Sequence, residues 1–185
     1  MSQPQQFTNI VACHVSKSFF LIFQIYSEIV SSEETTKEEK DLARLSILCG
    51  LSKYGKKSRA MQMYNECLEN NVALDVAAYN AVIVSLPTSG DMKDFPQDWG
   101  RAADVLKKMV SEGVQPTVRT LEAILTFIKR AGESNYSAST KQALSALTEF
   151  KTNLGILPSL GAYTALIEIF CHGNKLKVSK HILDY

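Results

Sequence analysis

The sequence lacks the patterns from which most catalytic and metal-binding sites are recognised. It contains no Gly-x-Ser-x-Gly, His-Glu-x-x-His or paired-carboxylate pattern. Its four cysteines, Cys13, Cys49, Cys67 and Cys171, lie far apart and form no Cys-x-x-Cys pair, so neither a zinc knuckle nor a disulfide framework is indicated. The sequence therefore favours a protein that is not an enzyme, and it indicates no metal or cofactor site.

A membrane span is also missing from the sequence. The stretch 15–30 is apolar, but Lys17, Gln24 and Glu28 interrupt it, whereas a membrane-spanning helix needs about 20 predominantly apolar residues. No arginine lies in this stretch, so it does not have the composition of a mitochondrial presequence. We expect a helix that packs onto the helices that follow it.

The chain has little net charge, and the charge it has is unevenly distributed. The formal net charge is +1. Residues 1–41 carry six acids and three bases, and the remaining residues carry 13 acids and 17 bases. The larger part is mildly basic, which is too weak a bias to indicate nucleic-acid binding by itself.

A pattern that recurs at a constant interval dominates the rest of the chain. Its three copies are Asp75–Ile83, Thr117–Leu125 and Ser159–Ile167. Each copy opens with a helix-capping residue type, followed by apolar residues at helical spacing. The turns 113–116 and 155–158 each begin with Gly and end with Pro, which ends one helix and prevents its continuation into the next. Repeats of this length are typical of stacked helical hairpins, whose usual work is binding.

The pattern predicts an all-α fold, a right-handed solenoid of helix–turn–helix repeats whose last repeat is incomplete. The predicted parts are an N-terminal segment with an acidic linker (1–41) and hairpins at 42–75, 76–117, 118–159 and, in part, 160–185. The first hairpin is expected to begin its helix at Leu42. In each of the next two hairpins, a polar loop is expected between the helices, so that the second helix begins at about Arg101 and Lys141. Gly90 and Pro96 indicate the first of these loops.

These hairpins resemble pentatricopeptide repeats. Residues 55–67 have a turn glycine, a small residue and an apolar pair like those of the family's second helix, and 101–109 match it more closely. Residues 79–83 and 163–167 are similar to the opening of the family's first helix. The resemblance covers about 42–185 and implies a solenoid that binds RNA.

A narrower resemblance is to the branch of this family found in the small subunit of the mitochondrial ribosome. It rests on two repeats, 76–117 and 118–159, that are elongated by loops between their helices, and on Trp99, just before a second helix. It implies a non-enzymatic mitochondrial protein that contacts small-subunit rRNA or mRNA and mitochondrial ribosomal proteins, and that supports mitochondrial translation. The alternative is a helical-repeat adaptor that binds only proteins, which the near-neutral charge favours.

The family also has positions at which a repeat can read one base through two or three side chains. The resemblance places these at Leu45 with Asp75, Asn80 with Thr117, Glu122 with Ser159, and Thr164. Leu45 cannot form hydrogen bonds, and an ionised Glu122 is acceptor-only and repels phosphate. We therefore expect weak sequence-specific readout, with Asn80, Thr117 and Thr164 as the candidate residues.

Basic residues near helix ends are the remaining candidates for RNA contact. Lys56 and Lys57 lie in the first hairpin, and Lys129 and Arg130 lie in the third. Such residues can contact phosphates without reading sequence. They also favour the negative end of a helix dipole, which is a purely structural reason for their presence. Both interpretations stay open on the sequence alone.

Overall fold

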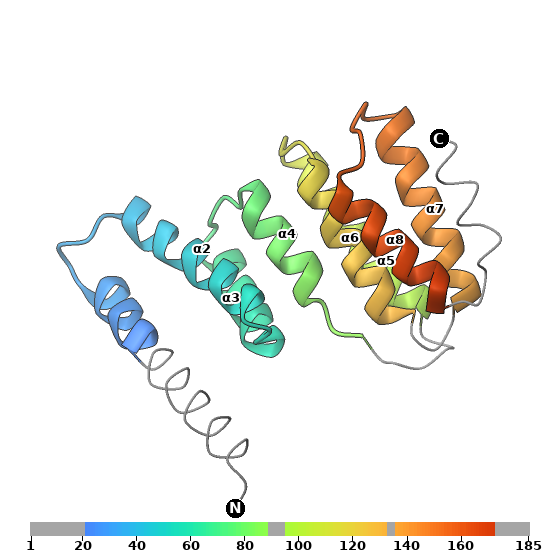
Figure 1. Cartoon of the computed structure of the whole chain (residues 1–185). Coiled ribbons are helices and arrows are strands. Elements are labelled where there is room, and N and C mark those ends of the chain that lie inside the picture. Colours follow the sequence, from blue (N-terminus) through green and yellow to red (C-terminus); the bar gives the residue numbers. More distant parts are fainter. Residues whose placement is uncertain (1–20, 89–94, 133–135, 173–185) are drawn as a thin grey trace, which may run out of the picture. The chain divides into compact units, whose positions relative to one another are not determined.

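The computed structural model describes residues 21–88, 95–132 and 136–172, and within these ranges every regular element is an α-helix (Figure 1). Residues 21–31 are helical. The helices that follow are α2 (Lys37–Lys53), α3 (Lys57–Glu69), α4 (Val76–Ser85), α5 (Phe95–Ser111), α6 (Val118–Ala131), α7 (Tyr136–Thr152) and α8 (Leu160–His172). The predicted all-α class is confirmed.

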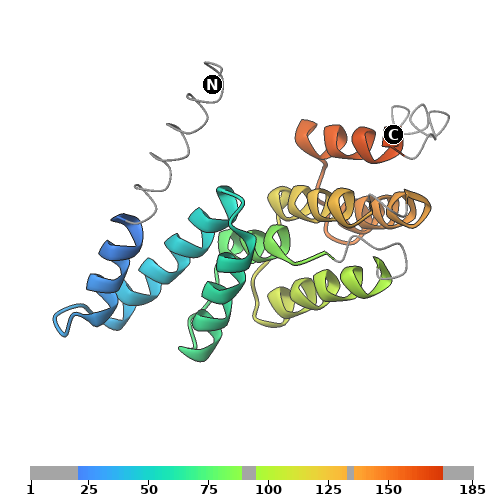
Figure 2. The same ribbon diagram turned by 90° about the horizontal axis from the view of Figure 1, so that it is seen from below.

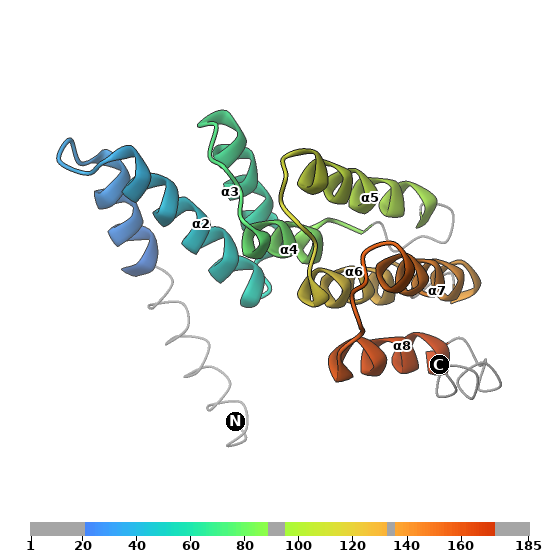
Figure 3. The same cartoon turned by 90° about the horizontal axis from the view of Figure 1, so that it is seen from above.

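The chain divides into two compact units, Met1–Ile47 and Leu48–Tyr185. In the second unit, α4 packs against α6 and α6 against α8, and Figure 3 shows these three helices in succession. The second helix of each hairpin packs beside this layer, with α5 against α4 and α6, and α7 against α6 and α8. Figure 2 shows α6 between α5 and α8. This is the solenoid arrangement that the repeat pattern predicts.

The core of the second unit consists of large side chains contributed by successive helices. Tyr79, Met109, Phe127, Phe150 and Phe170 come from five different helices and are all fully buried. Burial of one such side chain stabilises the fold by about 1.5–3 kcal/mol. Because each of these side chains is covered by neighbouring hairpins, stability depends on stacking rather than on any single hairpin.

The turns after α3, α5 and α7 follow the same interval as the sequence pattern. Asn71, Gly113 and Gly155 have φ values of 52°, 78° and 65°, and this left-handed conformation is one that glycine adopts without steric cost. The N–H of Val72 donates to the carbonyl of Cys67 at 2.9 Å, and the N–H of Val114 donates to that of Met109 at 3.0 Å. These bonds satisfy the last carbonyls of α3 and α5.

Helix starts follow this interval too, through their capping residues. The Asp75 carboxylate accepts the N–H of Ala78 at 2.7 Å, and Ser159 Oγ accepts the N–H of Ala162 at 3.1 Å. At the start of α6 the N–H of Thr117 donates to Thr120 Oγ1 at 3.0 Å. All three predicted capping positions are therefore helix starts in the structure.

Helix α2 begins at Lys37 rather than at Leu42 as predicted. The N–H of Thr36 donates to Glu39 Oε2 at 2.9 Å, and the N–H of Glu39 donates to Thr36 Oγ1 at 3.3 Å. This reciprocal pair is a capping box, which fixes the start of a helix. The hydrogen bonds from Thr36 also lower the pKa of Glu39. The last part of the predicted acidic linker is thus the first turn of α2.

The predicted late starts of α5 and α7 are wrong. Helix α5 begins at Phe95, because Pro96 stands in its first turn, where the missing N–H has no helical partner in any case. Helix α7 begins at Tyr136, and a Cβ placed on Gly132 would lie 2.2 Å from Ser139 Cβ. Only glycine permits this close turn between α6 and α7.

Two predictions fall partly on residues outside the described ranges. The helix expected over 15–30 agrees with the observed helix at 21–31, and its earlier residues are not described. The second helix expected in the last hairpin lies in 173–185, which is also outside the description. The division of the chain into hairpin boundaries stays a prediction.

Candidate nucleic-acid interface

Asn80 lies in the second turn of α4, on the layer of first helices. Its side chain is half-buried, and its Oδ1 is buried without a hydrogen-bond partner in the described part of the chain. Leaving a buried polar atom unpaired costs about 1–3 kcal/mol. When the side chain turns outward, this oxygen can accept a hydrogen bond from a ligand without breaking one inside the described part of the protein.

Thr117 and Thr164, the other predicted polar contacts, have local hydrogen bonds. Thr117 is half-buried at the start of α6, and its Oγ1 lies 3.5 Å from Thr120 Oγ1. Thr164 is exposed on α8, and its hydroxyl donates to the Leu160 carbonyl at 2.9 Å. A hydroxyl that donates still has acceptor lone pairs. Both positions can therefore still receive a hydrogen bond.

The third predicted reading pair is satisfied inside the protein. Glu122 accepts hydrogen bonds from Ser159 Oγ and, at 2.8 Å, from Arg119 Nη1. The bond from Ser159 lowers the pKa of Glu122 most, partial burial opposes this shift, and Arg119 adds to it. A Cβ on Gly161 would lie 2.8 Å from Glu122 Oε1, so the carboxylate packs closely on the start of α8. The pair joins two hairpins to each other.

Lys129 and Arg130 also make contacts between helices. Lys129 Nζ lies 2.7 Å from Glu168 Oε2 on α8. Arg130 donates from Nη1 and Nη2 to the carbonyls of Val84 and Leu86 at the end of α4. Arg130 therefore has a structural role, because its guanidinium binds the last carbonyls of a neighbouring helix. Contact of either residue with RNA stays a prediction.

Lys56 and Lys57 stand at the start of α3, where Lys56 is the exposed cap residue and Lys57 is the half-buried first helical residue. Lys57 lines a pocket of about 380 Å³ together with Ser85 at the end of α4 and Arg130 of α6. The structure thus brings two of the four predicted basic residues to one pocket, although they lie far apart in the sequence.

A polar cluster between α3, α4 and α5 corresponds to no pattern in the sequence. The buried Tyr79 hydroxyl donates to Glu112 Oε2 at 2.5 Å. Lys108 Nζ lies 3.8 Å from Glu112 Oε1 and 5.9 Å from the ring centre of Tyr64. Burial, and then the bond to Glu112, raise the pKa of Tyr79. The partners are 33 residues apart, so no local pattern could have revealed them.

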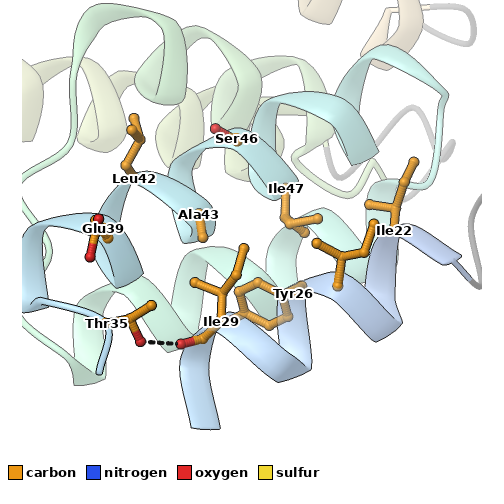
Figure 4. Close-up of a pocket in the computed structure, with 10 residues that line it drawn as sticks. Ile22, Tyr26, Ile29, Thr35, Glu39, Leu42, Ala43, Ser46 and Ile47 are labelled. Carbon is orange, nitrogen blue, oxygen red and sulfur yellow. Dashed lines mark hydrogen bonds between the residues drawn. The ribbon is translucent and has the colours of Figure 1, made fainter. Parts of the chain in front are cut away.

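A second pocket, of about 460 Å³, lies within the first unit between residues 21–31 and α2 (Figure 4). Its walls are mainly apolar, with Ile25, Ile29 and Ile47 among them, and Thr35 Oγ1 donates to the Ile29 carbonyl at 2.6 Å. The ten lining residues include one acid, Glu39, and no base. This chemistry does not suit phosphate.

None of the helices in the described ranges has both the length and the apolar character to cross a bilayer.

Helical hairpins that repeat at a constant interval define an α-solenoid repeat protein. Residues 25–183 match the family model described as the pentacotripeptide-repeat region of PRORP. The chain belongs to the pentatricopeptide repeat family, which confirms the resemblance seen in the sequence.

The curated relatives include several proteins named small ribosomal subunit protein mS39. The one from Drosophila melanogaster is 35% identical over 161 residues, which are 87% of this chain and 23% of the relative. The one from Xenopus laevis is 31% identical over 129 residues, which are 69% of this chain and 18% of the relative. The chain thus spans about a fifth of the length of these relatives.

Solved structures of the same fold are more distant in sequence. The pentatricopeptide repeat domain of Arabidopsis thaliana protein-only RNase P 1, solved in complex with tRNA, gives a TM-score of 0.56 at 22% identity and covers 74% of this chain and 65% of that one. The pentatricopeptide repeat protein PPR10, solved with an 18-nt psaJ RNA element, gives 0.60 at 21% identity and covers 87% and 21%. These matches establish the fold.

Proposed function

We propose that this chain is a non-enzymatic, RNA-associated repeat protein of the small subunit of the mitochondrial ribosome. The observation that carries the proposal is its 31–35% identity to proteins named small ribosomal subunit protein mS39. The proposed partners are mitochondrial small-subunit rRNA, mRNA or both, together with mitochondrial ribosomal proteins. Its proposed role is to support mitochondrial translation as a scaffold and RNA-contacting surface.

The candidate site supports a particular manner of RNA contact. Asn80 offers a base edge an acceptor that has no internal partner, and Thr117 is its proposed companion. The following pair, Glu122 and Ser159, is bonded to itself, so we propose that this repeat reads no base. With so few reading positions open, most of the binding free energy comes from phosphate contacts, which tolerate changes of sequence.

The second candidate function is an adaptor that binds only proteins. Two observations favour it. Lys129 and Arg130 are engaged by Glu168 and by the carbonyls at the end of α4, and the net charge of the chain is +1. An adaptor would still assemble with ribosomal proteins, but it would not touch RNA.

One experiment separates the two functions. The tagged chain is expressed in cultured cells, the mitochondria are isolated, and their lysate is sedimented on a sucrose gradient after ultraviolet crosslinking. The RNA-associated function predicts co-sedimentation with the small subunit and crosslinks to RNA on the chain itself. If the chain co-sediments with the small subunit even after RNase treatment and shows no crosslinks to RNA, the adaptor function would be established. Absence from mitochondria, or from the small-subunit fractions, would refute the proposed location.

A further inference from the structure

The pocket between α3, α4 and α6 has a positively charged wall. It lies where α3 begins and α4 ends, and its lining includes Lys57, Ser58, Ser85, Leu86, Thr88 and Arg130. The charged residues that line it are both basic. Its volume of about 380 Å³ can admit a phosphate together with part of an attached ribose.

The start of α3 adds a positive potential to this pocket. A helix N-terminus carries roughly half a positive charge and presents N–H groups to an anion. Helix α3 has 13 residues, and its cap residue, Lys56, forms no side-chain capping bond. A lysine ammonium has donors but no acceptor, so the cap position cannot supply the negative partner that Asp75 supplies to α4.

Ser85 provides an independent sign of a missing ligand. It is 1% exposed, and its Oγ has no hydrogen-bond partner in the described part of the chain. A serine in a helix can donate to the carbonyl three or four residues earlier, which here belongs to Val82 or Ala81. The Ala81 carbonyl already accepts the hydroxyl of Ser52 at 3.0 Å. The Ser85 hydroxyl is thus buried and unpaired in a residue that lines the pocket.

Arg130 is bonded to the backbone on either side of Ser85. Its guanidinium binds the carbonyls of Val84 and Leu86 and lies 5.5 Å from the ring centre of Phe127. These contacts compensate the negative end of α4, which would otherwise repel an anion. A guanidinium remains charged at any physiological pH. The pocket therefore combines a fixed positive charge, a helix N-terminus and an unpaired buried hydroxyl.

We infer that this pocket is a binding site for a phosphate group, which is held by the start of α3, Lys57, Arg130 and the Ser85 hydroxyl. The phosphate belongs to an RNA backbone, and this assignment of its source rests on the proposed function. The other source of the same chemistry is free phosphate. The site is lined by residues from three successive hairpins, and a phosphate bound there carries no sequence information.

The first test uses inorganic phosphate and the whole chain. Amide resonances of Ser58 and Ser85 are followed by NMR during titration with sodium phosphate, and sodium chloride of equal ionic strength is the control. We expect saturable shifts at these amides with phosphate only. Ser85→Ala should weaken phosphate binding several-fold without lowering the melting temperature, whereas Ser111→Ala, on an exposed serine, should change neither. Unchanged phosphate binding in Ser85→Ala, or shifts that chloride reproduces, would overturn the inference.

The second test uses a short single-stranded RNA and identifies the source of the phosphate. Affinity is measured by fluorescence anisotropy at several salt concentrations for the wild type, Lys57→Gln and Lys107→Gln. Lys107 is a matched control, exposed on α5. Loss of one phosphate contact should reduce the slope of log affinity against log salt by about 0.7, and only for Lys57→Gln. Phosphate binding without RNA binding would assign the pocket to free phosphate and would count against the proposed function. If Lys57→Gln leaves the salt slope of RNA binding unchanged and phosphate shifts no amide resonance, the pocket is not a phosphate site. The proposed function would then still hold.

Discussion

The hydrogen bond from Tyr79 to Glu112 is the contact whose loss can be predicted most closely. Tyr79→Phe keeps the ring, which is fully buried between hairpins, and removes only the hydroxyl that donates to Glu112 Oε2 at 2.5 Å. A hydrogen bond to a charged group contributes about 1.5–3 kcal/mol to stability. The Glu112 side chain is 43% exposed and has Lys108 at 3.8 Å, so water and the lysine compensate its carboxylate when the bond is lost. We therefore expect a loss near the lower limit of that range, about 1.5 kcal/mol.

The assay for this variant is urea denaturation of the whole chain, followed by far-UV circular dichroism. Tyr163→Phe is the matched control, because Tyr163 occupies the same repeat position on α8, where it is half-buried. The control should change the free energy of unfolding by less than about 0.5 kcal/mol. Equal stability of Tyr79→Phe and the wild type, or equal losses in the two variants, would refute the argument.

The same bond predicts how stability depends on alkaline pH. Burial and the bond to Glu112 raise the pKa of Tyr79 above its ordinary value of 10.0. Because the folded state keeps its proton to a higher pH than the unfolded state, the contribution of this group is complete below pH 10 and is lost as pH rises towards the folded pKa. Burial, together with the charge of Glu112, also raises the pKa of Tyr64. Tyr79→Phe should therefore remove part of the alkaline decline of the wild type, and an unchanged decline would contradict this account.

Five further variants can be measured by the same denaturation assay. Arg130→Ala leaves the carbonyls at the end of α4 without their donors and should cost about 1–3 kcal/mol; no loss would mean that water replaces the guanidinium. Gly155→Ala, at φ 65°, should cost about 1–2 kcal/mol, whereas Gly50→Ala, in the open interior of α2, should stabilise by about 0.5–1 kcal/mol; similar effects of the two would contradict the strain argument. The pKa of Glu122 is lowered from 4.5 by its bond from Ser159, so its contribution is present above pH 4.5 and lost as pH falls. The difference between the wild type and Glu122→Gln should accordingly shrink in acid, and a constant difference would exclude ionisation as its cause. Asn80→Ala removes an unpaired buried oxygen and should not lower stability; a clear loss would reveal an internal partner.

The features that the sequence predicted well are those fixed by neighbouring residues. The turn residues Gly113 and Gly155 are separated by one period of the repeat, and each adopts the left-handed conformation. Asp75 and Ser159 cap their helices through bonds to residues three positions away. Such features depend on local backbone chemistry, which repeats whenever the residue types repeat.

The features that the sequence did not predict depend on tertiary contacts, or on a residue type that is common in two different local structures. On the sequence alone Pro96 indicates a loop, yet in the first turn of a helix proline is well tolerated. The partner of Arg130 at the end of α4 is 44 or 46 residues away. One of the carbonyls within reach of Ser85, that of Ala81, accepts the hydroxyl of Ser52, which lies on a different helix. No periodicity in the sequence encodes such competition for an acceptor.

Two of the predicted reading positions, Asn80 and Glu122, differ in what they can offer a ligand, and this difference bears on the kind of RNA that the chain would hold. Asn80 keeps a free acceptor, whereas Glu122 has exchanged its capacity for bonds to Ser159 and Arg119 that fix α6 against α8. A carboxylate held ionised at that point also repels the backbone of an RNA passing over it. Recognition of a sequence by this fold needs consecutive open positions, because each repeat reads one base. An array in which one predicted reading position is closed, and in which phosphates supply most of the contacts as proposed, suits an RNA that is selected by where it lies. The proposed location meets this requirement, because the other components of an assembled ribosomal subunit would hold the RNA in place before any base is read.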